Sequence, residues 1–217
     1  MTKAIKDQLI LLCIHPEKGW VRKKSVIGHA LLAASLIDLS RQNAFWVEEG
    51  RIKVAQTNTT DPVFKELLTQ LNAWQGKKFS WLMTKLSMHV NKYYTLQMGC
   101  LERQHLISSI PIEWLGIRWG KRYRVNNPDN LKPIISDMER SLVYGRNSMT
   151  ETRLIIEFLG MLDLLGSFFM SKELKQRATK RWKTMSFHLL GEPNEMIQII
   201  FRELRNTLRV NKFSGKG

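Results

Sequence analysis

The stretch that decides the fold is Ser25–Arg41, SVIGHALLAASLIDLSR, in which nearly every position is apolar or small. One side of the helix that it predicts carries, at helical spacing, Ile27, Leu31, Ala34 and Asp38. Most of the other positions are apolar as well, and a helix that is apolar all round lies inside a protein. The stretch therefore predicts a helix at the centre of the core.

The segment before this helix predicts a shorter helix and a turn. Residues 5–14 form an apolar segment, which favours a short helix. Pro16 and Gly19 follow in the sequence HPEKG, and both residue types interrupt regular structure. We therefore expect the chain to turn before it enters the core helix.

The segment after the core helix predicts a hairpin and then a helix. Residues 43–54, NAFWVEEGRIKV, contain two β-prone runs around Glu48-Glu49-Gly50, a pattern typical of a hairpin closed by a glycine-containing loop. Asp61-Pro62 indicates a helix start, because Asp is a favoured N-cap and Pro is favoured at the first helical position. Gly76 is predicted to break that helix.

The middle of the chain predicts another helix followed by irregular structure. Residues 79–98 have amphipathic spacing and predict one helix that ends at Gly99. Residues 100–125 mix Pro, Gly and β-branched residues, which indicates short strands or an extended, hairpin-like excursion. Asn127-Pro128 then predicts a helix to about residue 144.

The C-terminal part predicts three more helices. Ser148 and Glu151, three positions apart, have the spacing of a capping box for a very apolar helix that ends near Met170. Residues 172–190 combine apolar residues at helical spacing with many Lys and Arg, which predicts a basic amphipathic helix. Pro193 is predicted to open the last helix.

Length and composition predict a single globular domain over residues 1–217, mainly α, with one or two small β-hairpins. Of the 217 residues 43% are apolar and seven are Trp, which allows a sizeable core, and no Pro-, Gly- or Ser-rich linker divides the chain. Cys13 and Cys100 lie in apolar sequence and not in a CxxC pair, so we expect buried free thiols.

The sequence favours a cytoplasmic location. The apolar run near the N-terminus contains Asp7 and lacks a small-residue cleavage site, which argues against a signal peptide. The longest apolar stretch, residues 154–170, carries Glu157 and Asp163 and is shorter than the ~20 residues that span a bilayer. We therefore expect no transmembrane helix.

The net charge of +15 is concentrated in two blocks of the sequence. Residues 76–124 hold nine Lys and Arg residues against two Glu, and residues 171–217 hold eleven against four Glu, so each block has a net charge of +7. The rest of the chain is close to neutral. This concentration of positive charge attracts polyanions, which are membrane headgroups, nucleic acid or acidic proteins. The charge alone does not indicate which of these is the partner.

The motifs of the common enzyme classes are absent from the sequence. We find no phosphate-binding, dinucleotide-binding, metalloprotease, serine-hydrolase or kinase signature. The five His residues are dispersed singly, and Glu48-Glu49 are neighbours at a predicted hairpin tip, where they do not form a converging carboxylate pair. We therefore expect a protein that is not an enzyme, with no catalytic residue, metal ion or cofactor.

Two basic segments are candidates for contact with an anionic partner. Residues 110–124, IPIEWLGIRWGKRYR, place two Trp among basic residues, and Trp favours the membrane interface, where its ring is half wet. The predicted membrane-interface residues are Trp114, Leu115, Arg118, Trp119 and Arg122. A loop that the two Trp fix to the core is the alternative. Residues 172–183 likewise fit either a lipid-facing helix or an ordinary solvated helix face.

Several of these motifs occur in an order and at a spacing that fit one family. They are the apolar run Leu9–Ile14, the turn Glu17–Trp20, the helix Gly28–Leu39 and the hairpin Asn43–Val54, then Asp61-Pro62, Gly99-Cys100-Leu101, Arg122-Tyr123 and Asn127-Pro128. In this the chain resembles, over nearly its whole length, the Golgi phosphoprotein 3 family, and most closely its bacterial members. Proteins of this family are mainly helical peripheral membrane proteins. The eukaryotic ones bind phosphatidylinositol 4-phosphate and act as adaptors for Golgi glycosyltransferases, so the resemblance implies lipid recognition without catalysis.

The resemblance also implies a headgroup site. In the eukaryotic members this pocket uses a Trp soon after the opening turn, an Arg in the next helix and two Arg one turn apart on a central helix. The matching positions here are Lys23, Leu32, Lys85 and Met88. The Arg pair, whose bidentate phosphate geometry Lys does not reproduce, is lost. We therefore expect a looser attraction to anionic headgroups, at about 1 kcal/mol for each basic residue, through Arg22, Lys23, Lys24 and Lys85.

The leading hypothesis is a non-catalytic peripheral membrane protein, attached to the Golgi in a eukaryote or to the inner membrane face in a bacterium. One alternative is nucleic-acid binding, which the interleaving of Trp119, Arg122 and Tyr123 also fits, although no RNP1-like, zinc-finger or clear helix-turn-helix pattern is present. The other is a helical adaptor that binds the tails of membrane proteins and touches lipid only incidentally.

Overall fold

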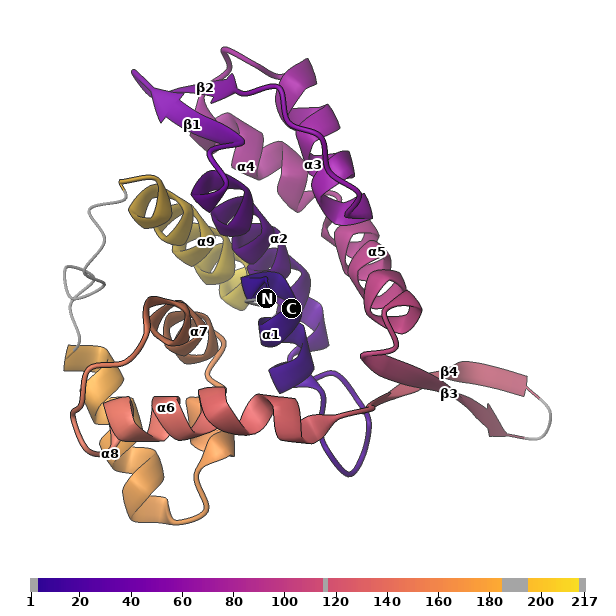
Figure 1. Ribbon diagram of the computed structural model, residues 1–217, viewed down its shortest axis with the longest axis vertical. Coiled ribbons are helices and arrows are strands. Elements are labelled where there is room, and N and C mark those ends of the chain that lie inside the picture. The colour runs from indigo at the N-terminus through magenta and orange to yellow at the C-terminus, as the bar shows by residue number, and fades with distance from the viewer. Residues whose placement is uncertain (1–3, 115–116, 185–194, 215–217) are drawn as a thin grey trace. The chain divides into compact units, whose positions relative to one another are not determined.

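The computed structural model describes residues 4–114, 117–184 and 195–214, with the side chains of Trp114, Arg118 and residues 210–214 outside this description. Its elements, labelled in Figure 1, form two compact units, Met1–Asn126 with Glu195–Gly217 and Asn127–Asn194. Within the described residues there are nine α-helices and two antiparallel two-stranded sheets. The predicted mainly α class with small hairpins is therefore confirmed. A single domain over the whole chain stays a prediction.

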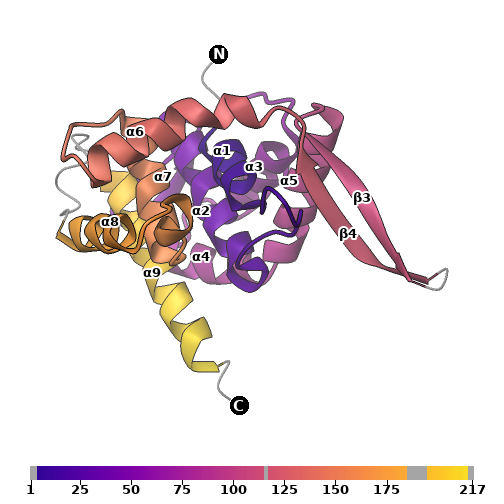
Figure 2. The same cartoon turned by 90° about the horizontal axis from the view of Figure 1, so that it is seen from below.

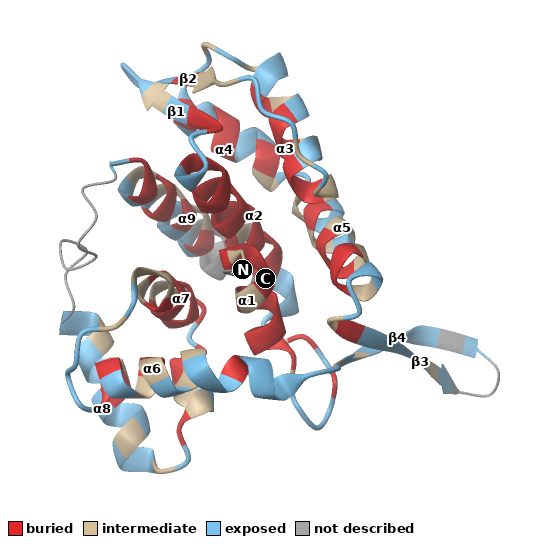
Figure 3. Cartoon of the chain, viewed as in Figure 1, coloured by how far each residue is buried: buried red, intermediate tan, exposed pale blue. Residues whose placement is uncertain are grey.

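The first unit is built around α2 (Lys24–Arg41), the predicted core helix. Every residue of α2 from Ala30 to Ser40 is buried, and Figure 3 shows how this burial follows the helix through the unit. The helices that pack against it include α1 (Ile5–Cys13), α5 (Val90–Arg103) and α9 (Glu195–Ser214). An all-round apolar sequence is explained by this position, because each face of α2 meets another helix or strand.

α1 is held in place by Asp38, a buried carboxylate of α2. The N-cap of α1 has no capping side chain, and the N–H groups of Ile5 and Lys6 instead donate to the two oxygens of Asp38, at 3.0 and 3.1 Å. The N–H groups of the first turn of a helix have no partner within that helix. Here Asp38, which is far away in the sequence, accepts their hydrogen bonds. Burial raises the pKa of the Asp38 carboxyl to about 6, although the two hydrogen bonds and nearby Lys6 favour its ionised form.

A fully buried lysine of α1 joins this helix to two further elements. The Nζ atom of Lys6 lies 3.0 Å from Asp7 Oδ1, 2.7 Å from Asp61 Oδ2 and 3.0 Å from Gln97 Oε1, which uses all three of its donors. Gln97 also donates to Asp7 at 2.6 Å. Burial lowers the pKa of Lys6, but the two carboxylates more than offset this, so the pKa is raised and the lysine stays charged. The cluster ties α1 to α5 and to the start of α3 (Pro62–Ala73).

The first predicted hairpin is confirmed. β1 (Phe45–Glu48) pairs antiparallel with β2 (Arg51–Val54). Glu49 and Gly50 between them have φ angles of 50° and 73°, and a two-residue turn of type I′ requires positive φ at both positions. The start of α3 is confirmed as well, because Asp61 Oδ1 accepts the N–H groups of the two residues after Pro62.

The single helix predicted over residues 79–98 is wrong. The chain forms α4 (Phe79–Ser87) and then α5, with Met88 and His89 between them. Both helices keep an apolar face toward the core, so the amphipathic periodicity runs on through the break. A periodic pattern of apolar residues indicates which face of a helix is buried, but it does not indicate where the chain changes direction.

A close approach between α5 and α2 lies directly after the break. A Cβ atom on Gly28 would lie only 3.0 Å from the Cβ of Val90, the first residue of α5. The predicted end of the helix at Gly99 is also wrong, because α5 continues to Arg103. A glycine inside a helix costs ~1 kcal/mol, which the packing of α5 offsets.

The irregular segment forms a long second hairpin, as predicted. β3 (Ile107–Trp114) pairs with β4 (Ile117–Val125) and projects from the helices of the first unit (Figure 2). The register shifts near its tip, where Ile112 pairs with Gly120 but Glu113 pairs with Arg118. Trp119 is therefore an extra residue in a β-bulge, a feature that re-aims a side chain.

The second unit consists of short helices. They are η1 (Pro128–Leu131), α6 (Lys132–Leu142), α7 (Thr150–Met161), η2 (Leu165–Phe168) and α8 (Lys172–Thr184). The predicted basic amphipathic helix is confirmed as α8, whose Trp182 donates to Glu157 of α7 at 3.0 Å. The final part of that prediction, residues 185–190, and the predicted helix start at Pro193 lie outside the described residues.

Two predictions for α7 are wrong. The capping box does not form, because Met149 is the N-cap and the Ser148 hydroxyl lies 3.4 Å from that of Ser141 instead. The helix ends at Met161 and not near Met170, since Asp163 has a φ angle of 57°, outside the helical range. The apolar sequence continues past this point because several of the following residues are buried in η2 and in the loops beside it.

Candidate membrane-contact surface

The β3–β4 hairpin exposes large apolar side chains. Ile110 is 50% exposed, Ile117 59% and Trp119 67%. Basic residues stand among them on β4, namely Lys121, Arg122 and Arg124, all exposed. Among the hairpin side chains that the structure describes, only Ile107, at the base, is buried, so most of these residues do not contribute to the core. A surface of this composition suits the boundary between headgroups and acyl chains.

Two of the predicted membrane-interface residues have side chains that the structure describes, and both lie on this hairpin. Trp119 and Arg122 are exposed on β4, so the alternative in which the Trp is fixed to the core is wrong for Trp119. Trp114 and Arg118 lie in the paired strands near the tip, but their side chains are outside the description, and so is the whole of Leu115.

The loop between α1 and α2, residues 14–23, is attached to the base of this hairpin. The N–H of Tyr123 in β4 donates to the carbonyl oxygen of Gly19 at 2.6 Å. Gly19 has a φ angle of 68°, and a Cβ there would lie 2.9 Å from the Tyr123 oxygen, so only glycine fits. We call these residues the opening loop.

The opening loop carries the predicted headgroup residues Arg22, Lys23 and, directly after it, Lys24. Arg22 is half-buried, whereas Lys23 and Lys24 are exposed. Lys23 is the N-cap of α2 and has a φ angle of 54°. This is the left-handed backbone conformation, which residues other than Gly and Asn rarely adopt. Trp20, 57% exposed, lies beside the charge of Lys18, whose Nζ is 5.6 Å from the ring centroid.

The fourth predicted headgroup residue, Lys85, lies on α4 and not in the opening loop. It is exposed on α4, with its Nζ 5.8 Å from the ring centroid of Trp81. Trp81 in turn meets Trp74 edge to face at 5.5 Å. Lys85 therefore stands beside a pair of Trp rings, one from α4 and one from the end of α3, whereas the other three basic residues lie in or directly after the opening loop.

The two uncharged positions of the implied pocket differ in their surroundings. Leu32 is 1% exposed inside the core, where its side chain cannot reach a headgroup. Met88 is 71% exposed between α4 and α5. Neither position can replace the phosphate-binding arginine that it matches in the resemblance.

Sequence reasoning missed two residues of this surface, Trp20 and Ile110, whereas Ile117 is one of the apolar residues that stand beside the basic ones in the predicted interface segment. Trp20 was present in the quoted turn motif, but nothing local to it indicates that the turn packs beside β4. Alternation along β3 could have indicated Ile110, because strand residues two positions apart share a face. The bulge that sets the exposure of Trp119 has no signal in the sequence.

Cysteines and groups of possible metal ligands are two features of the described residues that bear on catalysis. Cys13 and Cys100 are buried and free, as predicted, and burial raises the pKa of Cys13 to about 12, which keeps the thiol protonated. No group of three His, Cys, Asp or Glu side chains in the described part of the chain could hold a metal ion. No described helix is both long and apolar enough to cross a membrane.

Comparison with known proteins identifies the family. The sequence model of Golgi phosphoprotein 3 (GPP34) matches residues 5–198, which is most of the chain. No curated protein matches significantly. The matched range includes the opening loop, both hairpins and the start of α9. The chain therefore belongs to the Golgi phosphoprotein 3 family.

Proposed function

We propose that this protein is a non-catalytic peripheral membrane protein that binds anionic lipid headgroups with the opening loop and the β3–β4 hairpin. The observation that carries the proposal is the hydrogen bond between Tyr123 and Gly19, which attaches the basic loop to the exposed apolar hairpin. Charge and apolar surface thereby come from one part of the molecule, and stable reversible membrane binding needs both.

The basic and the apolar residues have different tasks in this proposal. Lys23, Lys24 and the basic residues of β4 attract the protein to an anionic surface, each contributing about 1 kcal/mol, and Lys85 adds to the same attraction. Trp119 and Ile117 then enter the interface, where a Trp ring is stabilised by contact with both water and acyl chains. Attachment on this basis is reversible.

The ligand that we propose is the anionic headgroup in general. Phosphatidylinositol 4-phosphate is the ligand of eukaryotic members, but of the four positions that match their pocket only Lys23 and Lys85 carry a positive charge. Leu32 is buried in the core and Met88 is apolar, so neither provides a charged hydrogen bond. The corresponding location is the cytoplasmic face of a membrane, the Golgi in a eukaryote or the inner membrane in a bacterium.

The test is cosedimentation with vesicles. Recovery with vesicles of phosphatidylcholine and an acidic phospholipid should exceed recovery with phosphatidylcholine alone. Trp119→Ser should weaken binding to the acidic vesicles about tenfold, because the interface loses a large apolar side chain. The matched control is Trp46→Ser, which removes an exposed Trp from the other hairpin and should leave binding unchanged. Equal recovery with both vesicle types, or with neither, would contradict the proposal.

Nucleic-acid binding is the second candidate, because Trp119 and Arg122 are exposed on one strand, as in proteins that stack single-stranded bases. A gel-shift titration with single-stranded RNA and DNA decides between the two. A complex that forms at lower protein concentration than the vesicle complex, and that Trp119→Ser weakens, would favour nucleic acid.

A further inference from the structure

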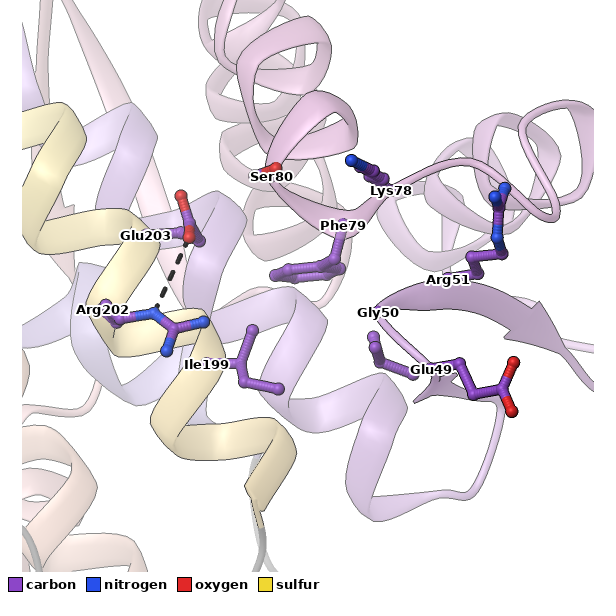
Figure 4. A pocket seen from close by; sticks show the side chains of 10 residues that line it. Glu49, Gly50, Arg51, Lys78, Phe79, Ser80, Ile199, Arg202 and Glu203 are labelled. Carbon is purple, nitrogen blue, oxygen red and sulfur yellow. Dashed lines mark ion pairs between the residues drawn. The ribbon is translucent and has the colours of Figure 1, made fainter.

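A cavity of about 290 Å³ lies in the first unit, away from the opening loop and the β3–β4 hairpin. Three elements line it: the tip of the β1–β2 hairpin, the start of α4, and α9 (Figure 4). Its volume is at the small end of the range for ligand sites, ~300–1,000 Å³. A ligand of this cavity is therefore a small molecule.

One wall of the cavity is apolar. Phe79, at the start of α4, is only 3% exposed and stacks on Phe45 of β1 with ring centroids 6.4 Å apart and planes 12° from parallel. Val47 and Ile199, both half-buried, also line the cavity. A ligand that covers this wall needs an apolar part, because a bare ion would leave the apolar side chains in contact with water.

Arg202 of α9 supplies a positive charge opposite that wall. In Figure 4 its guanidinium points across the opening toward Phe79. Arg202 forms an ion pair with Glu203, at 3.8 Å from Nε to Oε1, and its terminal guanidinium nitrogens have no partner among the described residues. Arg51 and Glu49 also line the cavity but point away from it in Figure 4, and Arg51 donates to the carbonyl of Gly76 at 2.8 Å.

The start of α4 adds donors to the same opening. Lys78, the N-cap, has no side-chain hydrogen bond to the helix and no ion pair with another described residue. The N–H of Phe79 donates to Gly50, but those of Ser80 and Trp81 have no hydrogen-bond partner among the described residues. Such N–H groups and the helix dipole favour an anion, and here they supplement the guanidinium and ammonium groups.

The charge balance decides which anion fits. Lys78 and Arg202 oppose Glu203, and Arg51 opposes Glu49, so the lining carries one positive charge in excess. A monoanion is neutralised by that excess, whereas a dianionic phosphate would keep a charge of its own beside Glu203.

We infer that this cavity binds a small organic carboxylate, with its apolar part against Phe79 and its carboxylate between Arg202 and the start of α4. The site is separate from the proposed membrane contact, because none of its lining residues belongs to that surface. The inference therefore holds whether or not the protein binds lipid.

Amide NMR of the full chain with phenylacetate as the probe tests this inference. Titration should shift the signals of Gly50, Ser80 and Trp81 and saturate in the millimolar range. Phenylacetamide, which has the same shape without the charge, should leave them in place. Arg202→Gln should weaken phenylacetate binding about tenfold, since it removes a charge-assisted hydrogen bond. The matched control, Arg209→Gln, removes an exposed charge from the same helix and should change nothing.

Four results would overturn the inference: no saturable shift, an equal shift with phenylacetamide, undiminished binding by Arg202→Gln, or tighter binding of inorganic phosphate than of phenylacetate. Vesicle binding gives an independent readout. Arg202→Gln should leave recovery with acidic vesicles unchanged, and a loss as large as that of Trp119→Ser would show that the cavity is not a separate site.

Discussion

Asp38 is a buried carboxylate whose ionisation opposes folding while its oxygens hold the first turn of α1. Its pKa is about 6 in the folded protein and near its ordinary value of 3.8 when unfolded. Between these pH values the folded chain keeps a proton that the unfolded chain has lost. The stabilising contribution of Asp38 is therefore complete below pH ~4 and lost as pH rises to ~6, by about 3 kcal/mol.

Urea denaturation across this pH range checks the Asp38 prediction. The free energy of unfolding of the Asp38→Asn variant should lack this decline with pH, because Asn does not titrate. The variant will be less stable overall, since its single amide oxygen can accept from only one of the two N–H groups at a time in this geometry. A variant with the same slope as the parent chain would assign the decline to other groups.

Lys23 combines exposed positive charge with a backbone conformation that favours glycine. Lys23→Gly should keep the free energy of unfolding or raise it by up to ~1 kcal/mol, because the left-handed strain disappears. Lys24→Gly should lower it by ~0.5–1 kcal/mol, since position 24 is helical. Both changes should weaken binding to acidic vesicles about fivefold, as one charge is lost in each.

Thermal denaturation and vesicle cosedimentation of the two variants separate these effects. If the two variants lose vesicle binding equally although their stabilities change in opposite directions, the loss of binding is due to the lost charge and not to a change in folding. Unchanged binding in both would remove the opening loop from the proposed surface.

At the scale of elements, two glycines on packed helices should respond to alanine in opposite ways. Gly28→Ala places a methyl group 3.0 Å from Val90 and should cost about 1 kcal/mol, because overpacking exceeds the gain in helix propensity. Gly99→Ala, in the interior of α5, meets only the end of Arg103 at 3.5 Å and should stabilise by about 1 kcal/mol. Urea denaturation of both variants is the measurement, and the same sign in both would contradict the α2–α5 contact.

Elements with local signals were predictable from sequence. The all-round apolar composition of α2, the Asp61-Pro62 start of α3 and the Glu49-Gly50 turn each contain the physical reason for the structure within a few residues. The break before Val90 was not predictable from periodicity, because the apolar pattern runs on through it, and the contact of Val90 with Gly28 joins positions far apart in the sequence. The failed capping box has the same kind of cause, since Ser148 meets Ser141 and not its own helix.

The candidate surface was predictable only in part for the same reason. Trp119 and Arg122 stood out by their residue types, and both proved exposed. The sequence grouped Lys85 with Lys23 by resemblance alone, whereas in the structure Lys85 stands beside Trp81. The bond from Tyr123 to Gly19, which joins loop and hairpin, links positions about a hundred residues apart and leaves no local pattern.

At the scale of the whole molecule, the excess of positive charge makes salt the decisive variable. With a net charge of +15, vesicle binding should fall steeply as ionic strength rises from ~0.05 to ~0.5 M, because the Debye length shrinks from ~14 to ~4 Å. Cosedimentation over this range is the measurement, with Trp119→Ser as the comparison. The parent chain should retain a fraction bound at high salt that the variant loses, and binding independent of salt would contradict an electrostatic attachment.

The last helix, α9, returns to α2 only after the whole second unit has been passed in the sequence. During synthesis the ribosome releases α2 long before α9, so one apolar face of α2 has no cover while about 150 further residues are made. The core of the first unit can close only after translation has reached the final helix. The nascent chain is thus a natural client for chaperones, and its yield in a cell-free system should depend on them.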